Sequence, residues 1–564
     1  MGFFWTIVVL VIALGLCWRF LGSYMAAVFC DRVHFLGWIE RPIYKVLGTG
    51  TGPEHEQSWK RYGGSLVIFS AITLGLTYLL LRIQGSLPLN PQHLHAVGPA
   101  LSFNTASSFL TNTNWQNYGG ETTMSYFSQM GAITVQQFVS AAAGIAVAIA
   151  LVRGFSRRKS PTIGNFWVDI TRCILYILVP VAFVAGIIYV GQGAVQTLAG
   201  PVSISDHLNR VTQTLARGPI GFMEPIKQLG TNGGGFLDQN GATPFENPTG
   251  LTNLLSIFLV LCIPFALTYT FGKMVGSVKH GVALLAAMLL IFGVWVGFTS
   301  HFEHQNNPAV AAAGVTSTVG NTEGKEVRFG DTSTALYGVA STQTSTGSAD
   351  ASYDSFTPMG GFGLLTGMML GEVSPGGTGT GLYTILLDAI IAVFIGGLMI
   401  GRTPEYLGKK IQAREVKLAG LGVLVMPIIV LVFTAIAVSV SAGRAGPLNA
   451  GPHGFSEILY ALTSQANNNG SAFGGLTGNT PFYNIVGAMD MLLGRFAIMI
   501  PVLALAGALA AKNVVPASLG TFRTDNTMFV GLVVGVILIV GGLTFFPAIA
   551  LGPIAEQLAH GMFF

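Results

Sequence analysis

Charged residues are scarce in this chain. Asp, Glu, Lys and Arg make up 9% of its 564 residues, whereas 51% of the residues are hydrophobic. Soluble domains carry roughly 25% charged residues, so the composition excludes an ordinary soluble protein. Together with a mean hydropathy of +0.61, it predicts an integral membrane protein.

The few cysteines form neither a disulfide pattern nor a metal pattern. Cys17, Cys30, Cys173 and Cys262 include no C-x-x-C pair, and three of them lie within apolar runs. We therefore expect free thiols rather than a disulfide framework or a zinc site.

Motifs that bind or hydrolyse ATP are also missing. The nearest match to a phosphate loop, Gly408-Lys409, has Lys410 in place of the required Ser or Thr and Thr403 in place of the first glycine. An Asp-Lys-Thr-Gly phosphorylation motif is absent. The chain by itself is therefore predicted to be neither an enzyme nor a nucleotide-binding protein, and to have no catalytic residues.

Long apolar runs dominate the sequence instead. A run of about 20 apolar residues can cross the roughly 30 Å hydrocarbon core of a bilayer. The ten candidates are 4–28, 63–84, 125–152, 165–191, 251–275, 280–300, 358–401, 417–441, 482–511 and 527–551. The first run lacks a basic leader, so we interpret it as a retained helix rather than a signal peptide. The run at 358–401 is too long for one straight crossing.

The basic residues are unevenly distributed between the connecting segments. Eighteen Lys and Arg lie in one set of connections, and six lie in the other. The basic set consists of 30–61, 153–160, 273–280, 402–417 and 512–525. Because basic loops stay in the cytoplasm, both chain termini are expected on the outer side of the membrane.

A polar run rich in Gly, Asn, Ser and Thr occurs four times between apolar spans. The copies are Leu110–Asn114, Leu229–Gly235, Gln343–Ser348 and Gln465–Ala472. Taking Asn114, Gly233, Gly347 and Gly470 as equivalent, the intervals are 119, 114 and 123 residues. Four exposed turns would share this composition, but the regular period and the flanking spans indicate an internal repeat.

Each polar run lies between two spans, which predicts a helix, a re-entrant loop and a second helix in every repeat. The repeats are expected at about 60–152, 165–275, 280–401 and 417–511, with extra spans at about 4–28 and 527–551. Non-helical backbone at membrane depth must be buried in protein or line a watery cavity. The predicted fold is an all-α polytopic membrane protein with one domain over 1–564 and four loops around a central pore.

The composition of the four loops suits a dehydrated monovalent cation. Backbone carbonyls can replace the hydration shell of such an ion without trapping it. Glycine allows the backbone conformations that turn carbonyls inward, and Asn or Thr side chains can hold that backbone. Carboxylates, several of which a calcium site would need, are absent from the core triplets. The sequence therefore favours K⁺.

Four sequence words resemble one known family. They are Gly230–Phe236, Pro244–Thr249, Gly401–Lys410 and Ala466–Phe473. On these words, and essentially end to end, the chain is similar to the potassium-transporting ATPase A subunits (KdpA), in the superfamily of potassium transporters. The resemblance implies a K⁺-binding and translocating subunit of an ATP-driven uptake complex in the bacterial inner membrane. Its implied partners are a P-type ATPase catalytic subunit that uses ATP and Mg²⁺, small single-span subunits and membrane lipid, with no nucleic acid.

The resemblance also implies which residues form the K⁺ selectivity filter. By position these are Asn112, Thr113, Asn114, Thr231, Asn232, Gly233, Ser345, Thr346, Gly347, Asn468, Asn469 and Gly470. Thr346 stands where much of the family is expected to have Cys. Both residues are small and a backbone carbonyl is the expected ligand, so the assignment holds.

Three further features are candidates for the ion path or its gate. Gln116 follows the first triplet and is expected just beneath the filter, at the start of a lateral path to the pump subunit. Glu372, Gly376 and Gly377 belong to the run Gly371–Gly381, which must break the seventh span because proline and glycine disfavour helix. A passive kink is the alternative for that run.

Arg495 lies inside the ninth span, where a central Arg costs roughly 2.5–3.5 kcal/mol on insertion scales. We expect its guanidinium to bond to carbonyls of the broken span or to Glu372, and so to help close the pore. The alternative is a purely structural pair with Asp490. Asp388, also within a span, has no assigned role.

Two other functions are consistent with parts of the pattern. One is a self-sufficient K⁺ channel or symporter subunit of the same superfamily, and the other is a non-transporting membrane scaffold with degenerate pore loops. The word Gly401–Lys410 and the two extra terminal spans argue against the first. K⁺-stimulated ATP hydrolysis by the copurified complex would separate all three.

Overall fold

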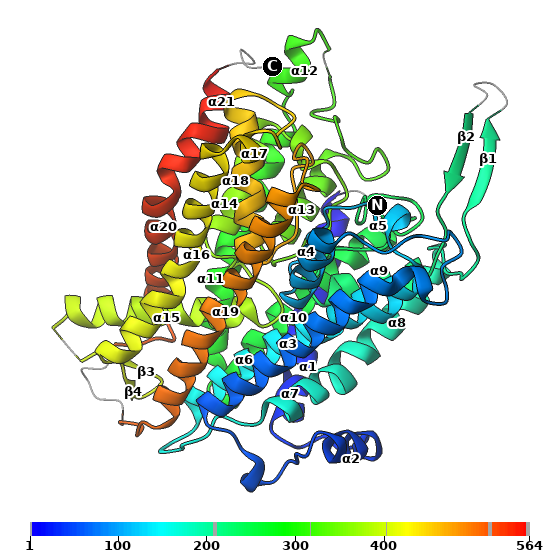
Figure 1. Cartoon of the computed structure of the whole chain (residues 1–564). Helices are drawn as coiled ribbons and strands as arrows, with labels where there is room; N and C mark the ends of the chain where they lie inside the picture. Colours follow the sequence, from blue (N-terminus) through cyan, green and yellow to red (C-terminus); the bar gives the residue numbers. More distant parts are fainter. Residues whose placement is uncertain (1–2, 207–210, 316, 402, 517–521, 560–564) are drawn as a thin grey trace.

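Ten helices of the computed structural model are long and apolar enough to cross a membrane (Figure 1). The structure describes residues 3–206, 211–315, 317–401, 403–516 and 522–559. The crossing helices are α1 (Phe3–Phe29), α3 (Trp59–Ile83), α6 (Val135–Ser156), α7 (Phe166–Arg172) continued by α8 (Val179–Gly191), α10 (Gly250–Met274), α11 (Val278–Glu303), α15 (Thr380–Met399), α16 (Ala413–Ser439), α19 (Pro481–Ala510) and α20 (Thr527–Ile549). The predicted number of spans and the helical fold class are confirmed.

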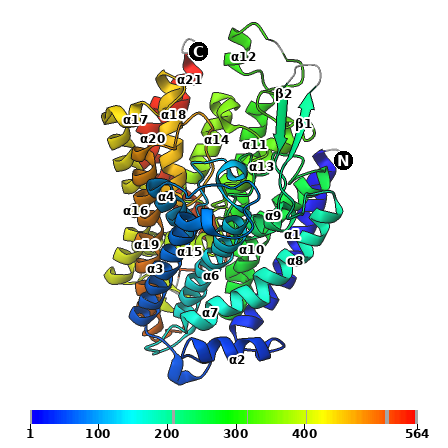
Figure 2. The same ribbon diagram turned by 45° about the vertical axis from the view of Figure 1, so that its right-hand side comes forward.

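Four shorter helices stand between pairs of crossing helices and lead directly into the four polar runs. We call them the pore helices: α4 (Pro99–Leu110), α9 (Ile220–Leu229), α13 (Asp331–Thr342) and α18 (Gly451–Asn467). The order of crossing helix, pore helix and crossing helix therefore occurs four times along the chain. Figure 2 shows the pore helices among the long helices, with α4, α13 and α18 in the upper half of the view and α9 lower, beside α10.

The remaining elements are short and connect the helices. The helices among them are α2 (Gly37–Val46), η1 (Pro53–His55), η2 (Gln84–Ser86), α5 (Gly120–Thr123), η3 (Ser128–Thr134), η4 (Cys173–Leu178), α12 (Pro308–Ala312), η5 (Tyr353–Ser355), α17 (Ser441–Arg444), η6 (Ala550–Ile554) and α21 (Ala555–Leu558). Two antiparallel hairpins complete the described chain: β1 (Val202–Asp206) pairs Val202 with Leu215 of β2 (Val211–Leu215), and β3 (Glu405–Tyr406) pairs with β4 (Lys409–Lys410). The first hairpin projects from the helical body, at the end opposite to α2 (Figure 1).

The long apolar run at 358–401 is broken as predicted. It forms α14 (Pro358–Met369) and α15, separated by residues 370–379, which we call the break loop. Proline at 375 cannot donate a backbone hydrogen bond, and Gly371, Gly376 and Gly379 have positive φ angles of 86°, 79° and 92°. These conformations end one helix and re-aim the chain before the next begins.

Threonine caps the helix that follows each of the last three polar runs. The side-chain oxygen of Thr249 accepts from the backbone of Thr252 at the start of α10, Thr357 caps α14, and Thr480 caps α19. A side-chain oxygen at this position satisfies one of the free N–H groups of the first turn. The shared cap is a further trace of the repeat.

The core lies where α6, α10, α15 and α19 meet. Helix α6 is buried along residues 141–152, whereas α1 and α20 expose large apolar side chains such as Phe20 (67%) and Leu543 (79%). α1 packs along α10, and α20 packs against α15 and α11. Exposed apolar faces of this size suit lipid tails rather than water, so the chain is an integral membrane protein.

Candidate functional site: a ring of four loops

Each pore helix ends at one of the four predicted triplets, and the chain turns in the same way in all four. The first residue of every triplet has a positive φ angle: 69° at Asn112, 49° at Thr231, 53° at Ser345 and 58° at Asn468. This left-handed conformation is uncommon for residues other than glycine. Its recurrence at four equivalent positions shows a shared backbone design that the sequence period alone could not reveal.

The triplets form a closed ring in which each loop contacts the next. We call these twelve residues the loop ring. Between the first two loops, the amide of Asn112 donates to the carbonyl of Thr231 (2.9 Å), and the amide of Asn232 donates to the side-chain oxygen of Asn112 (2.7 Å). Between the second and third, the backbone N–H of Gly347 donates to the carbonyl of Asn232 (3.1 Å).

The remaining contacts between neighbouring loops are made at glycines, where the backbones lie too close together for a side chain. A Cβ at Gly233 would collide with the backbone of Gly347, and one at Gly347 would lie 2.8 Å from the carbonyl carbon of Gly470. A Cβ at Gly470 would strike the carbonyl oxygen of Thr113, and Gly470 has a positive φ of 96°. Close backbone approach therefore requires glycine at these positions.

Hydrogen bonds from hydroxyl and amide side chains stabilise the backbone of these loops. In the first loop Thr111 and Thr113 share a hydrogen bond of 2.7 Å between their hydroxyls, and in the third loop Thr344 and Thr346 do the same at 2.8 Å. In the fourth loop, the side chain of Asn469 donates to the carbonyls of Ser341 and Thr342. The ring itself contains no ionisable side chain.

The electrostatics of the ring favour a cation. All four pore helices direct their C-terminal ends at it, and the C-terminus of a helix carries partial negative charge. Ring carbonyls and hydroxyls add neutral oxygen ligands. Such an arrangement can hold a weakly hydrated cation and release it again, since no full negative charge traps it.

A vestibule opens on one side of the ring, and Gln116 lies there. The third residues Gly347 and Gly470 line this vestibule. Gln116 donates to the carbonyl of Gly235 and accepts from its N–H, both at 3.0 Å. The expectation that Gln116 lies beneath the filter is thus not met: the chain reverses at the end of the pore helix, so residues after the triplet lead towards the vestibule.

On the opposite side of the ring lies a second space, which we call the central cavity. It is lined by Ser345 and Asn468, the first residues of the third and fourth triplets, and by Glu372 of the break loop. The buried carboxylate of Glu372 accepts from the hydroxyl of Ser345 and from the amide of Asn469 (2.9 Å). Glu372 therefore links the third and fourth loops beneath the ring.

The break loop is also attached to the second and third loops. The N–H of Thr378 donates to the hydroxyl of Thr231 (2.9 Å), and the two hydroxyls lie 2.9 Å apart. The N–H of Gly376 donates to the carbonyl of Gln343 (2.8 Å). Gly377 lies so close to the ring that a Cβ would be 2.9 Å from the side chain of Ser345. The interruption is thus a structured element in contact with the loops of the ring.

Arg495 lies beside this assembly but has a different partner from those expected. Within the described part of the chain its guanidinium makes one hydrogen bond, to the carbonyl of Ser140 in α6 (3.0 Å). Glu372 is occupied by the ring, and neither carboxylate oxygen of Asp490 has a partner among the described residues. Asp490 precedes Arg495 by five residues, so the two side chains leave the helix on different faces.

The guanidinium nevertheless stays close to the break loop. Gly379 packs on Gly144 of α6, and a Cβ at Gly144 would lie 2.5 Å from the carbonyl oxygen of Thr378 and 3.2 Å from a terminal nitrogen of Arg495. Both groups therefore approach the same point on α6. A positive charge is fixed next to the segment that interrupts the seventh span.

A buried ion cluster behind the second loop escaped the sequence reasoning. Lys227 is fully buried, and its ammonium lies 2.6 Å from Glu224 and 3.2 Å from Glu246. Glu246 in turn accepts from the backbone of Gly241, and a Cβ at Gly235 would lie 2.7 Å from the ammonium. Glu224 and Lys227, two opposite charges three residues apart within one pore helix, were the available signal.

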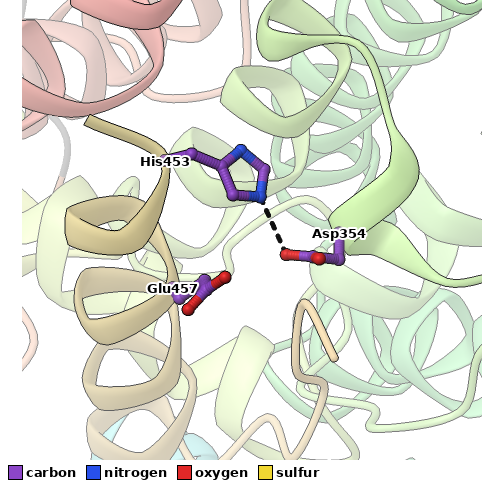
Figure 3. Close-up of side chains that lie close together, drawn as sticks. All are labelled: Asp354, His453 and Glu457. Carbon is purple, nitrogen blue, oxygen red and sulfur yellow. Dashed lines mark hydrogen bonds and ion pairs between the residues drawn. The ribbon is translucent and has the colours of Figure 1, made fainter. Parts of the chain in front are cut away.

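A second cluster lies beside the vestibule, where His453 of α18 faces Asp354 and Glu457 (Figure 3). One ring nitrogen contacts Asp354 at 2.9 Å and the other contacts Glu556 at 2.8 Å. Burial opposes the charge on the ring, but the hydrogen bonds to the two carboxylates outweigh it and raise the pKa of His453 to about 10. A protonated imidazole with both nitrogens engaged is a clamp between chain segments, and it does not fit a metal ligand.

Relatives with known names share this sequence almost end to end. A subunit of Mesorhizobium japonicum named potassium-transporting ATPase potassium-binding subunit is 53% identical over 557 residues, which cover 98% of this chain and 97% of the relative. A protein of the same name from Methylorubrum extorquens is 54% identical over 545 residues, covering 96% and 95%. The chain spans nearly the full length of both.

Among solved structures, the fold is similar to that of the potassium transporter TrkH from Vibrio parahaemolyticus. The TM-score is 0.51 at 15% sequence identity, and the match covers 78% of this chain and 84% of the transporter. The profile of the family described as potassium-transporting ATPase A subunit matches residues 7–558. With that match and relatives above 50% identity, this chain belongs to the family of potassium-transporting ATPase A subunits (KdpA).

Proposed function

We propose that the loop ring is a K⁺ selectivity filter and that this chain is the K⁺-binding and translocating subunit of an ATP-driven uptake complex. The observation that carries the proposal is the ring itself: four triplets, each with a left-handed first residue, contact one another in sequence around one point. The names of the relatives, potassium-binding subunits of a potassium-transporting ATPase, agree with this role.

The neutrality of the ring supports K⁺ over other ions. A divalent cation such as Ca²⁺ binds carboxylates, and none belongs to the ring. K⁺ loses its hydration shell more readily than smaller ions and is coordinated by rings of backbone carbonyls in known filters. The vestibule would receive K⁺ from outside the cell, and the central cavity would receive it after the ring.

The break loop supports a closed path beneath the filter. A pump must prevent ions from running back through its own pore, so a free axial exit is incompatible with ATP-driven uptake. Residues 370–379 lie directly under the third loop and are tied to three of the four loops. With Arg495 beside it, this segment would act as the gate, and Glu372, Gly376 and Gly377 would hold its shape.

ATP hydrolysis is assigned to a partner chain. The relatives are named as the potassium-binding subunit of the ATPase, and this sequence contains neither a complete phosphate loop nor the phosphorylation motif. The proposed partners are a P-type ATPase catalytic subunit, small single-span subunits and membrane lipid of the bacterial inner membrane. The distribution of basic loops supports a cytoplasmic position for α2 and β3–β4 and an external one for the vestibule.

K⁺-stimulated ATP hydrolysis by the complex that copurifies with the chain tests this function. Gly470→Ser and Gly233→Asp are expected to raise the K⁺ concentration for half-maximal stimulation at least about tenfold, equivalent to ~1.4 kcal/mol, and to admit Na⁺ or Rb⁺. The reason is that a Cβ at either position collides with a neighbouring loop. Gly193→Ser is the matched control, because Gly193 also has a positive φ (105°) but has open space around its Cβ position.

The outcomes separate the alternatives. Unchanged K⁺ dependence in both ring variants would remove the ring from K⁺ selection. K⁺ current through the chain alone, without any ATPase, would identify a self-sufficient channel or symporter. If neither K⁺ current nor K⁺-stimulated ATP hydrolysis is found, the chain is a non-transporting membrane scaffold.

A further inference from the structure

The position four residues before each triplet is a serine in three repeats and a lysine in the other. The four residues are Ser108, Lys227, Ser341 and Ser464. They are equivalent in space as well as in sequence. In all four loops the backbone carbonyl at this position accepts from the N–H of the second triplet residue, at distances of 2.8 to 3.1 Å. Lys227 therefore departs from a pattern whose role the other three repeats show.

In the three serine repeats, the side chain at this position fixes the far end of the loop. Each hydroxyl bonds to the backbone of the third triplet residue or of the residue directly after it. The pairs are Ser108 with the carbonyl of Trp115 (2.9 Å), Ser341 with the carbonyl of Ser348 (2.5 Å) and Ser464 with the N–H of Gly470 (2.9 Å). The pore helix thus supports the loop that follows it.

The second loop has few side chains of its own at this end. Residues 233–235 are three consecutive glycines, which we call the glycine run, and glycine has the largest backbone freedom. The hydroxyl pairs of the first and third loops have no counterpart here, because Gly230 and Asn232 stand where those loops have threonines. Support for the glycine run therefore has to come from neighbouring segments.

Lys227 places an ammonium group directly behind the glycine run. A Cβ at Gly235 would lie 2.7 Å from the nitrogen and 3.2 Å from the Cδ of this lysine. The ammonium is fully buried between the carboxylates of Glu224 (2.6 Å) and Glu246 (3.2 Å). Because a buried charge that loses its partners is strongly destabilising, the two carboxylates keep the ammonium in this place.

The cluster also reaches the loops on either side of the second one. Gly235, in front of the ammonium, is the residue that Gln116 of the first loop binds. Towards the third loop, Glu224 accepts from the amide of Gln228 (2.9 Å), and the same amide lies 2.7 Å from the hydroxyl of Ser348. A displaced ammonium would therefore disturb contacts with the first and third loops as well.

We propose that Lys227 is a positioning residue of the loop ring. Its ammonium, paired with Glu224 and Glu246, does for the second loop what a serine hydroxyl does for the other three. It fixes the glycine run, so that the carbonyls of the second loop keep the spacing that selects K⁺. An ammonium has no acceptor and cannot be a ligand of the ion, so Lys227 acts through the loop backbone. This inference rests on the proposed filter.

Lys227→Met tests the proposal, because methionine has a similar length and lacks the charged, hydrogen-bonding end. In the purified complex, the K⁺ concentration for half-maximal stimulation of ATP hydrolysis should rise at least about fivefold, and the preference for K⁺ over Rb⁺ should fall by a similar factor. The maximal rate at saturating K⁺ should stay within about twofold of the wild type, since only binding at the ring is weakened.

A variant without any charge in the cluster separates positioning from stability. Lys227→Met alone leaves two buried carboxylates without their cation, so it should also lower the midpoint of thermal unfolding. The triple variant Glu224→Gln, Lys227→Met, Glu246→Gln should recover that midpoint but not the preference for K⁺ over Rb⁺, because the glycine run still lacks its support. It also provides the test if Lys227→Met does not assemble. Recovery of both properties would overturn the positioning role.

Lys325→Met is the matched control. Lys325 is also a buried ammonium paired with a carboxylate, that of Glu303 (2.6 Å), but it lies in the connection between α12 and α13, outside the pore helices. Its replacement should lower stability and leave the preference for K⁺ unchanged. An equal loss of K⁺ preference in Lys325→Met would mean that destabilisation alone explains the effect, and would overturn the proposal.

The failure of this inference differs from the failure of the filter. If Lys227→Met keeps the wild-type K⁺ dependence while Gly233→Asp and Gly470→Ser change it, the filter stands and the positioning role of Lys227 is wrong. If none of the three variants changes the K⁺ dependence, the loop ring does not select K⁺.

Discussion

The four repeats build the loop ring alike, but they differ beneath it. Helices α6, α10 and α19, the second spans of the first, second and fourth repeats, follow their loops as single long helices. In the third repeat the shorter helix α14 and the break loop precede the crossing helix α15. The ring needs similar contributions from all four loops to surround one ion. The gate that we propose needs one element that differs from the others, and the break loop is such an element in the third repeat.

The interruption is also where the two regions are joined. Breaking a helix leaves backbone groups without partners, and at membrane depth they must be satisfied by protein. Here the N–H groups of Gly376 and Thr378 are satisfied by Gln343 and Thr231, which belong to the loops of the ring. A movement of the break loop would therefore remove hydrogen bonds from the loops of the ring, and a movement of those loops would remove hydrogen bonds from the break loop.

The largest effect on K⁺ stimulation is expected from a charge placed in the vestibule, next to the loop ring that all four repeats form. Gln116→Arg puts a fixed positive charge beside Gly235, in the vestibule lined by Gly347 and Gly470. Two charges about 5 Å apart near a protein surface repel by about 3 kcal/mol, or roughly a hundredfold in affinity. K⁺ stimulation of ATP hydrolysis should be abolished in the physiological range.

Gln239→Arg is the control for this prediction, since Gln239 lines the same vestibule but is exposed and lies farther along the chain from its triplet. It should have a much smaller effect. Wild-type stimulation in an assembled Gln116→Arg complex would show that ions do not pass this side of the ring.

The second-largest effect is expected beneath the ring, at the break loop of the third repeat and at Arg495 beside it. Arg495→Met, or deletion of Gly376–Thr378, should raise passive K⁺ flux through liposomes containing the complex by at least about tenfold while ATP-driven uptake falls. The fixed charge beside Gly144 and Thr378 would no longer oppose K⁺, and the shortened break loop would no longer fill the path.

Arg495→Lys keeps the charge and should leak less than Arg495→Met. If Arg495→Met liposomes show no added passive flux and normal driven uptake, Arg495 is structural and the gate lies elsewhere.

The number of spans, the four polar loops and the break in the seventh span could be predicted because each leaves a local pattern in the sequence. Length, hydrophobicity and the run Gly371–Gly381 are enough for these. The pairing of side chains could not be predicted in the same way. Arg495 is recognisable as a costly charge, yet its partner, the carbonyl of Ser140, is 355 residues away and carries no side-chain signature.

The two buried ion clusters, around Lys227 and His453, could not be predicted for the same reason: their members are brought together only by the fold. Lys227 meets Glu246 only because the chain folds back after the second loop, and His453 joins Asp354 and Glu556 from other parts of the chain. The side of the ring on which Gln116 lies could not be predicted either, because a pattern of residue types does not give the direction in which a re-entrant chain runs.

A smaller effect is expected from the contact between ring and break loop. Thr378→Val keeps the shape of the side chain but removes its hydroxyl, which lies 2.9 Å from that of Thr231. One buried hydrogen bond is worth about 1 kcal/mol, so passive K⁺ flux should rise roughly fivefold. Thr378→Ser retains the hydroxyl and should behave like the wild type. Equal flux in the Val and Ser variants would show that this contact does not hold the gate.

The smallest effect on transport is expected at His453, which is outside both the ring and the break loop. The pKa of His453 is raised to about 10 by Asp354 and Glu556, against about 6.5 in the unfolded chain. Its contribution to stability is therefore fully present below pH 6.5, declines as the pH rises, and is lost above about pH 10.

His453→Gln should accordingly lower the midpoint of thermal unfolding more at pH 6 than at pH 10.5, while K⁺ selectivity stays unchanged. Glu457 also faces the ring of His453, so its charge is part of the same measurement. Because the clamp joins the fourth pore helix to Asp354 of the third repeat and to α21, it holds the repeats together without touching the ion path. His301→Gln, at an exposed histidine, is the control. An equal loss of stability for His453→Gln at both pH values would mean that packing, rather than the charge of the imidazole, joins these segments.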